Sequence, residues 1–161
     1  MVNISYRQLW VAMSVLLLST SAYTETSAVL PTQADFHQAG RNALRDKLPV
    51  LVLFSSADCG YCSVVKESFL EPMIKSGEYT DKVLIRVVDI DSGDDVRDFN
   101  GMLIDSDDMA EKYDVQLTPT VTFLDSHGKE LVERVIGLGT IEYYGGFLDD
   151  AIDESLVKLR H

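Results

Sequence analysis

The only two cysteines of the chain, Cys59 and Cys62, stand three residues apart. An apolar run at 50–54, typical of a strand buried on both faces, precedes them, and a helical pattern begins at Cys62. The thiolate is the reactive form of cysteine, and a helix N-terminus stabilises it through free N–H groups and the helix dipole. This arrangement predicts redox chemistry, with Cys59 as the exposed nucleophile and Cys62 as the thiol that resolves a mixed disulfide.

Other interpretations of the cysteine pair stay open. A disulfide across so short a loop constrains little chain entropy, so stabilisation alone is a poor explanation for it. The pair could be a chance meeting of two core cysteines, or two thiolates that bind Cu(I), a soft ion suited to such ligands. No histidine or methionine-rich tract lies beside the motif, although Met102 and Met109 occur further along the chain.

The N-terminus has the pattern of a secretory signal peptide over residues 1–22, with position 28 as a later candidate cleavage site. Arg7 supplies the positive charge, an apolar run covers 9–18, and small residues follow. That run has about ten residues, whereas a membrane-spanning helix needs about 20. We therefore expect export of the rest of the chain, with an uncleaved membrane anchor as the alternative. Export brings oxidising conditions, which give a cysteine pair a redox context.

Composition limits the classes of protein that the chain can be. Its 161 residues, 46% of them hydrophobic and 25% charged, fit one folded domain. The 26 acids and 14 bases leave a formal charge of −12, which disfavours the clustered basic surface of a nucleic-acid-binding protein. Two cysteines and three histidines are too few for a disulfide scaffold or a four-ligand metal site. We therefore expect neither a bound metal nor a nucleic-acid partner.

The first half of the chain predicts the elements that hold the cysteine motif. Residues 35–47 form an amphipathic helix, residues 62–75 a second helix that Pro72 kinks or ends, and residues 83–90 a strand. The inward positions of the first helix are Phe36, Ala39, Ala43 and Leu44. Together with the strand at 50–54, the order strand, helix, strand favours a parallel pair of strands.

The second half of the chain predicts a sheet edge and a final helix. The acidic stretch 91–108 is irregular, and a short helix covers 106–113. An alternating strand at 120–124 leads through a turn into a second strand over 130–136. The last helix covers 141–159, and its apolar stripe consists of Ile141, Tyr144, Leu148, Ile152, Leu156 and Leu159.

Three separated segments resemble the thioredoxin-like family. Residues 54–62 resemble its active-site segment, residues 113–120 its later segment with a cis proline, and Ile136-Gly137 the end of its last strand. The resemblance covers residues 33–158 and implies an α/β protein with the thioredoxin fold, a central mixed β-sheet flanked by helices. The chain resembles exported bacterial members, including those associated with sulfur oxidation or cytochrome c maturation, which implies a periplasmic location. The domain then spans 33–161, with an acidic insertion at 93–109.

The resemblance also implies roles for individual residues. Cys59 attacks the substrate, Cys62 resolves the mixed disulfide, and Pro119 is cis and faces the disulfide. Thr118 offers backbone groups to an extended substrate, and Gly137 lies beside the substrate groove. The resemblance implies no cofactor other than the redox-active disulfide itself.

The residues between the cysteines, Gly60 and Tyr61, leave the direction of the reaction open. The resemblance implies a monomeric reductase of protein or small-thiol disulfides, kept reduced by a membrane electron donor. A disulfide isomerase or oxidase is the alternative, because periplasmic isomerases carry a Gly-Tyr pair at this place. Those isomerases are dimers with a separate dimerisation domain, for which too few residues precede the first predicted helix. Both residues are candidate substrate contacts, and Tyr61 is otherwise an exposed spacer.

The chain departs from the family pattern at three positions. Leu53 replaces a buried acid, Asp58 replaces a tryptophan before the first cysteine, and Val87 replaces the lysine that pairs with the buried acid. Without an internal carboxylate, deprotonation of the resolving thiol depends on water or on the substrate. Asp58 opposes thiolate formation on its neighbour by like-charge repulsion. We expect Lys66 to solvate the surface of the helix that follows the motif, with a weak offset of this repulsion as the alternative.

Overall fold

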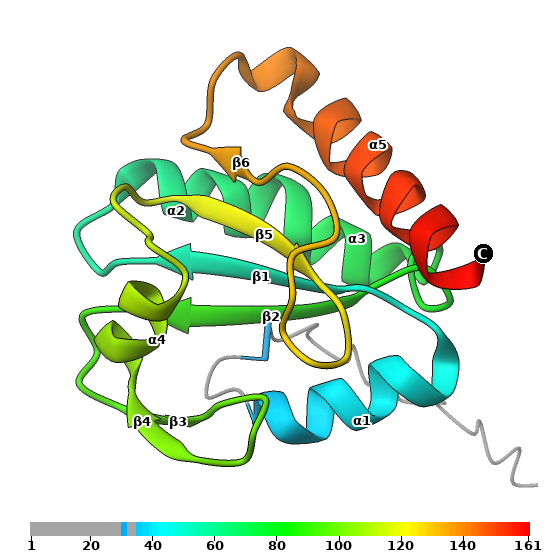
Figure 1. The fold of residues 1–161 in the computed structure, drawn as a ribbon. Coiled ribbons are helices and arrows are strands. Elements are labelled where there is room, and N and C mark those ends of the chain that lie inside the picture. Colours follow the sequence, from blue (N-terminus) through cyan, green and yellow to red (C-terminus); the bar gives the residue numbers. More distant parts are fainter. Residues whose placement is uncertain (1–29, 32–34) are drawn as a thin grey trace, which may run out of the picture.

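The structure of the protein is a computed structural model that describes residues 30–31 and 35–161. The predicted signal segment, residues 1–22 with its alternative end at position 28, lies outside the described residues. The main sheet has four strands in the order β2-β1-β5-β6, and a separate pair consists of β3 and β4 (Figure 1).

The strands of the main sheet run in both directions. β1 (Val50–Ser55) and β2 (Leu84–Asp89) are parallel neighbours. β5 (Thr120–Leu124) is antiparallel to β1, and β6 (Val135–Ile136) is antiparallel to β5. The predicted parallel pair and the mixed sheet are therefore confirmed.

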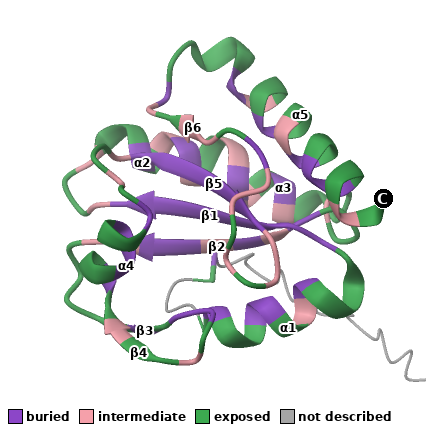
Figure 2. Cartoon of the chain, in the orientation of Figure 1, coloured by how far each residue is buried: buried purple, intermediate pink, exposed green. Residues whose placement is uncertain are grey.

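Helices cover both faces of the main sheet (Figure 1). The α1 face carries α1 (Phe36–Asp46) and α4 (Ser106–Lys112), and the α2 face carries α2 (Gly60–Val65), η1 (Lys66–Leu70), α3 (Glu71–Ser76) and α5 (Ile141–Arg160). Alternate residues of β1 serve these two faces: Leu51 and Leu53 join the core of the α2 face, and Val52 and Phe54 join that of the α1 face. Every residue of β1 is buried (Figure 2), as predicted for a strand with helices on both sides.

The helix that follows the motif differs from its prediction around Pro72. Helical structure runs without a break from Gly60 to Ser76, through α2, η1 and α3. The η1 segment is π-helical, and the N–H of Glu71 donates to the carbonyl of Lys66, five residues earlier. In a regular α-helix a proline ring clashes with the carbonyl four residues earlier, and here the wider turn directly precedes the proline. Of the two predicted effects of Pro72, a kink or the end of the helix, the second is wrong, because the π-helical turn accommodates the proline and α3 continues to Ser76.

Two predicted core positions lie at the surface instead. Leu44 of α1 is 64% exposed, and Ile141, at the first position of α5, is 44% exposed. After α1, Lys47 adopts the left-handed conformation and turns the chain, so that Leu48 is buried in place of Leu44. The central positions of the α5 stripe are buried as predicted: Tyr144, Leu148, Ile152 and Leu156.

The predicted strand over 130–136 is mostly irregular. It consists of the two residues of β6 and an isolated bridge between Leu124 and Glu130. Between them, Arg134 donates to the carbonyl of Tyr113 at 2.6 Å and forms an ion pair with Glu130. These side-chain contacts bind the segment to the loop after α4 rather than to β5 along its whole length.

The acidic segment 91–108, predicted to be irregular, contains a hairpin. β3 (Asp95–Arg97) and β4 (Leu103–Asp105) pair in antiparallel fashion. The turn between them places Phe99 in the core of the α1 face, where its ring lies 5.4 Å from that of Phe36. The prediction failed because the hairpin is stabilised by a buried polar residue rather than by apolar alternation.

That buried polar residue is Asp98, whose side chain is 1% exposed. Its carboxylate accepts the backbone N–H groups of Asn100 and Met102, each at 2.9 Å, and pairs with the ammonium of Lys112 at 2.9 Å. Burial opposes ionisation, but the hydrogen bonds from Lys112, Met102 and Asn100 outweigh it and hold the pKa of Asp98 below its usual range. Asp98 thus joins the hairpin to α4.

We expect Asp98→Ala to lower the free energy of unfolding at pH 7 by about 2–4 kcal/mol, because it leaves two backbone donors and Lys112 without their acceptor. Since folding lowers the pKa of Asp98, its ionised form stabilises the fold above the unfolded pKa of about 3.9 and loses that effect as pH falls further. Urea unfolding of both proteins at pH 7 and pH 3 measures this. A difference that stays constant between the two pH values would contradict the prediction.

Candidate functional site

A disulfide between Cys59 and Cys62 lies where β1 has ended and α2 begins. Its sulfur atoms are bonded at 2.02 Å. Cys59 is the N-cap residue of α2, with extended backbone, and its Sγ accepts the N–H of Cys62 at 3.1 Å. Cys62 is 1% exposed, whereas Cys59 is only partly buried. A substrate can therefore approach Cys59, and Cys62 lies behind it in the protein.

The loop that leads into β5 lies against residues 56–59, the motif loop, which joins β1 to α2. The hydroxyls of Ser56 and Thr118 are hydrogen-bonded at 2.9 Å, and the Thr118–Pro119 peptide bond is cis. The N–H of Gly137 donates to the carbonyl of Pro119 at 2.7 Å. Gly137 has a φ of 71°, a conformation that glycine adopts readily and other residues rarely do. Thr118, Pro119 and Gly137, all predicted site residues, therefore lie together beside the motif loop.

The carboxylate of Asp91 also contacts the motif loop. Both oxygens of its carboxylate lie 3.0 Å from the backbone nitrogen of Ala57, two residues before Cys59. Asp91 was predicted only as part of an irregular acidic stretch, and this contact was not predicted. Its position just beyond a strand parallel to β1 was the available signal, because the carboxyl ends of parallel strands meet at one edge of the sheet.

Lys66 and Asp89 form an ion pair that the sequence analysis also missed. The ammonium of Lys66 lies 2.7 Å from Oδ1 of Asp89, and the two side chains are 25% and 31% exposed. Lys66 was expected to solvate the helix surface, and this is wrong because its side chain reaches the end of β2. Lys66 stands four residues after Cys62, on the same side of the helix. Because Cys62 is buried, this spacing was the sequence signal that Lys66 lies toward the sheet.

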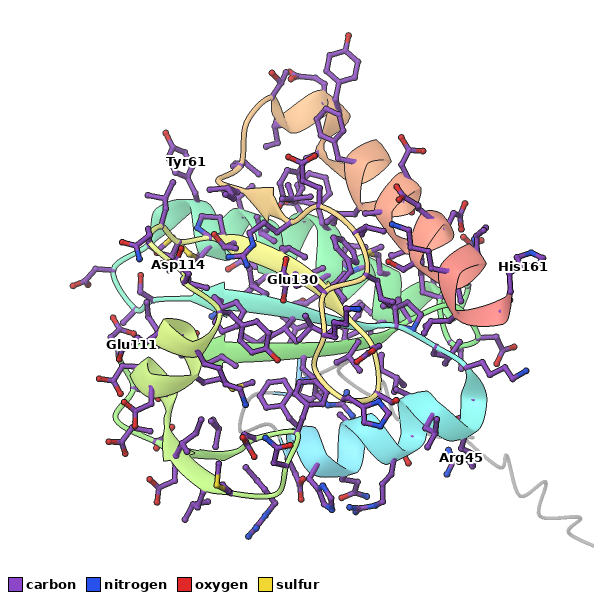
Figure 3. The ribbon with its side chains drawn as sticks, in the orientation of Figure 1. Arg45, Tyr61, Glu111, Asp114, Glu130 and His161 are labelled. Atoms are coloured by element: carbon purple, nitrogen blue, oxygen red, sulfur yellow. A yellow bond between two sulfur atoms is a disulfide. The ribbon has the colours of Figure 1, made fainter. Side chains whose placement is uncertain are left out.

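Three exposed apolar side chains come from segments that meet at the disulfide. Tyr61 is 67% exposed at the start of α2 and points away from the protein (Figure 3), Leu117 is 55% exposed before the cis proline, and Ile136 is 60% exposed in β6. Tyr61 was a predicted site residue, whereas Leu117 and Ile136 were not. Gly60 is exposed between Tyr61 and Cys59. This surface can contact apolar parts of a substrate close to the reactive sulfur.

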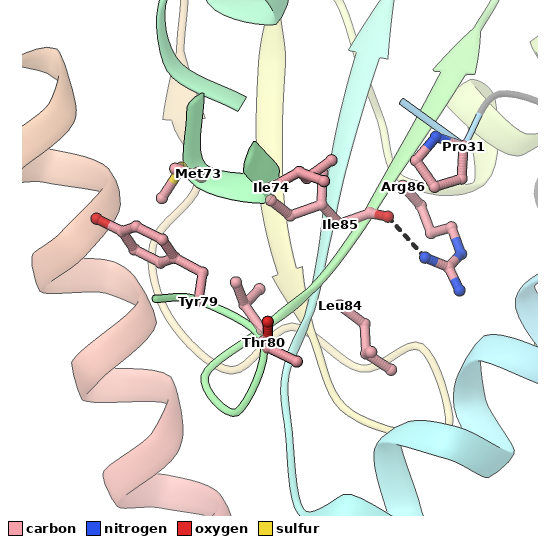
Figure 4. A pocket seen from close by; sticks show the side chains of 9 residues that line it. Pro31, Met73, Ile74, Tyr79, Thr80, Leu84, Ile85 and Arg86 are labelled. Atoms are coloured by element: carbon pink, nitrogen blue, oxygen red, sulfur yellow. Dashed lines mark hydrogen bonds between the residues drawn. The ribbon is translucent and has the colours of Figure 1, made fainter. Parts of the chain in front are cut away.

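A pocket of about 250 Å³ lies elsewhere, at the start of β2 (Figure 4). Its lining consists of Pro31, Met73, Ile74, Tyr79, Thr80, Val83, Leu84, Ile85 and Arg86. In this lining, the hydrogen bond to Asp149, together with burial, raises the pKa of Tyr79 to about 12. None of the residues at the disulfide lines this pocket, so it is separate from the redox site.

Within residues 30–31 and 35–161, no three side chains of histidine, cysteine, aspartate or glutamate gather as metal ligands. No helix in this described part has the length and apolar character needed to cross a bilayer.

The sequence of residues 36–152 matches a family described as thioredoxin-like domain. A search of curated proteins finds no match. Several solved structures share the fold at low sequence identity. Thioredoxin from Trypanosoma brucei brucei is 20% identical, with a TM-score of 0.53 over 81% of this chain and 94% of its own. Poplar thioredoxin h, PtTrxh4, is 19% identical, with a TM-score of 0.52 over 75% of this chain and 95% of its own.

A structure described as DsbH oxidoreductase is 17% identical to this chain, with a TM-score of 0.56. The similar region covers 79% of this chain and 88% of that one. These similarities confirm the predicted thioredoxin fold, with its mixed sheet of four strands flanked by helices.

We expect Asp91→Ala to slow disulfide exchange at Cys59 by about threefold to tenfold, because a lost anchor of about 1 kcal/mol lets the motif loop move. The initial rate of reaction of the reduced protein with a small aromatic disulfide measures this. Asp94→Ala is the matched control, since Asp94 lies in the same acidic loop and its side chain forms no hydrogen bond or ion pair with the motif in the described part of the chain. Equal rates for the two variants would contradict a role for Asp91.

Proposed function

Because the chain belongs to the thioredoxin-like family, we propose that it is an exported reductase of protein disulfides. Its activity is that of a thiol–disulfide oxidoreductase. One observation carries the proposal: the Cys59–Cys62 disulfide lies at the start of a helix with one sulfur accessible and the other buried. The direction, location and partners given below are parts of this proposal.

The reaction starts from the reduced protein, in which both cysteines are thiols. The Cys59 thiolate attacks one sulfur of a substrate disulfide, forms a mixed disulfide, and releases the other substrate sulfur as a thiolate. The Cys62 thiolate then attacks Sγ of Cys59, the bond between Cys59 and the substrate breaks, and the second substrate thiolate leaves. The substrate gains two electrons and two protons, and the protein is left with its Cys59–Cys62 disulfide.

The loop before β5 supports the binding of an extended substrate segment. Thr118 and Pro119 lie beside the motif loop through the Ser56–Thr118 hydrogen bond, so Thr118 can offer its backbone groups to a substrate near Cys59. Exposed Leu117 supplies apolar contact in the same loop, and Tyr61 does so across the motif. These groups contact backbone and apolar side chains, which suits a range of protein substrates and also small-thiol disulfides.

The pattern of residues 1–22 supports export, and the resemblance to bacterial proteins supports the periplasm as the location. An exported reductase in an oxidising compartment needs a supply of electrons, because each turnover leaves its disulfide oxidised. We assign that supply to a membrane electron donor, which reduces the Cys59–Cys62 disulfide by two electrons. The protein acts as a monomer in this scheme.

We expect Cys59→Ser to lower dithiol-driven reduction of insulin to the uncatalysed rate, because it removes the attacking sulfur. Cys62→Ser keeps the attack but cannot resolve it, so a mixed disulfide accumulates and mass spectrometry detects the substrate bound to Cys59. Ser63→Ala, an exposed neighbour of the pair, is the control and retains the wild-type rate. Activity that survives in Cys59→Ser would rule out the proposed chemistry.

The reduction potential of the Cys59–Cys62 pair tests the direction of the reaction. We expect a value near about −270 mV, comparable to that of thioredoxin, from equilibration of the purified protein in glutathione or dithiothreitol buffers. A value between about −180 and −120 mV would mark an isomerase or an oxidant instead. Tight, stoichiometric Cu(I) binding without insulin reduction would favour the metal-binding alternative.

A further inference from the structure

The apolar surface at the disulfide continues past Ile136 into a groove. This β6–α5 groove has a volume of about 360 Å³ and lies between residues 132–136, which end in β6, and one side of α5. Phe147, Asp150, Ala151 and Glu154 line it on the helix side. Ile136 belongs both to this groove and to the exposed surface around the disulfide. A molecule bound at Cys59 can therefore extend into the groove.

The inner part of the groove is apolar. Val132 is buried, and Ala151 is half-buried and packs against the core of the α2 face. Phe147 is 52% exposed on the same side of α5 as Ala151, because residues four apart lie on one side of a helix. Continuous apolar surface that is left exposed on a folded protein is typical of an interaction site.

One wall of the groove is the free edge of the main sheet. β6 is the terminal strand of the order β2-β1-β5-β6. The N–H of Gly137 donates to the carbonyl of Pro119, so the backbone of Gly137 faces the β5 side. Backbone groups alternate along an antiparallel strand, and the N–H and C=O of Ile136 therefore face away from β5. An extended chain laid along this edge can form hydrogen bonds with both groups.

The rim of the groove is acidic. Glu133, Asp150 and Glu154 are exposed there. Glu154 pairs with Lys158 at 2.8 Å, and the guanidinium of Arg134 donates to the loop after α4. Within residues 30–31 and 35–161, neither Glu133 nor Asp150 forms an ion pair. Basic side chains on a bound segment would match this rim.

We propose that the β6–α5 groove binds an extended segment of the protein substrate, next to its reactive disulfide, that carries apolar and basic side chains. The backbone of the segment pairs with the edge at Ile136. Its apolar side chains contact Phe147 and Ala151, and its basic side chains lie beside Glu133 and Asp150. Binding there raises the local concentration of the substrate disulfide at Cys59. This assignment rests on the proposed reductase function and names its class of substrate.

A second copy of this chain fits the groove less well. Two copies paired through their β6 edges would bring their acidic rims together, and like charges across an interface cost several kcal/mol. The formal charge of −12 on each copy adds to this repulsion. Charge complementarity therefore favours a basic segment of another protein.

Two synthetic peptides test the groove. Each has a central cysteine, held as a mixed disulfide with coloured thionitrobenzoate, between alternating leucine and lysine residues; in the matched peptide glutamate replaces lysine. Attack of reduced Cys59 on the peptide sulfur releases the coloured thiolate, and its absorbance gives the second-order rate constant. We expect the lysine peptide to react about tenfold faster or more at low salt, and about 0.5 M sodium chloride to reduce this ratio.

Variants of α5 separate the groove from general charge effects. We expect Asp150→Lys and Phe147→Ser each to lower the rate constant for the lysine peptide by about threefold or more. Asp153→Lys and Val157→Ser are matched controls, because both residues are exposed on α5 and neither lines the groove. The controls should stay within about twofold of wild type. Equal effects of the groove variants and their controls would overturn the assignment.

A trapped complex gives a structural measurement. In Cys62→Ser the peptide stays bound to Cys59 as a mixed disulfide. We expect the amide hydrogen of Ile136 to exchange about tenfold more slowly or less in the complex with the lysine peptide than in the free protein, because it bonds to the added strand. Unchanged exchange at Ile136 would also overturn the assignment.

The reaction with dithionitrobenzoate, which is too small to reach along the groove, distinguishes failure of the groove from failure of the chemistry. All four α5 variants should react with it within about twofold of wild type. Loss of this reaction in the wild-type protein would overturn the proposed function itself. Dimers that light scattering detects, and that Asp150→Lys strengthens by removing repulsion, would assign the groove to a second copy and overturn the substrate assignment.

Discussion

The disulfide depends on the complete burial of β1 between two layers of helices. All six residues of the strand are buried, so alternate side chains are held by two separate cores and the strand cannot slip by one residue. The strand ends at Ser55, and the motif loop carries the chain the short distance to Cys59. A fixed strand end therefore determines where the attacking sulfur lies, although neither cysteine belongs to the sheet.

The parallel pairing of β1 and β2 brings polar groups to this same end of the sheet. Asp89 and Asp91 are separated by one residue, yet they act on different parts of the site. Asp89 ends the strand and pairs with Lys66 on the helix, whereas Asp91 lies beyond it and accepts the N–H of Ala57. One strand end thus contacts both the loop before Cys59 and the helix after it. Charge-assisted bonds on two sides therefore add to the apolar packing that holds the geometry of the motif.

Sequence patterns predicted the parts of this protein that depend on apolar periodicity. The buried β1 run, the parallel crossover and the central stripe of α5 follow from hydropathy alone, and the fold followed from three motif segments. The hairpin around Asp98 and the polar contacts of Asp89 and Asp91 did not, because hydrogen bonds and ion pairs of single polar side chains leave no periodic trace. The continuation of the helix past Pro72 was missed for a related reason, since a π-helical turn depends on backbone adjustment rather than on residue type.

The position of the acid at the strand end has an energetic consequence. At position 53 a carboxylate would be enclosed by the core of the α2 face, and a buried charge without a partner costs several kcal/mol. At position 89 the carboxylate is 31% exposed and has an ammonium partner, so its desolvation is partial. The core beneath the motif can then be wholly apolar at Leu53 and Val87, and the charge lies where the sheet meets solvent. The stability of the central strands and the charge at this end of the sheet are thereby assigned to different residues.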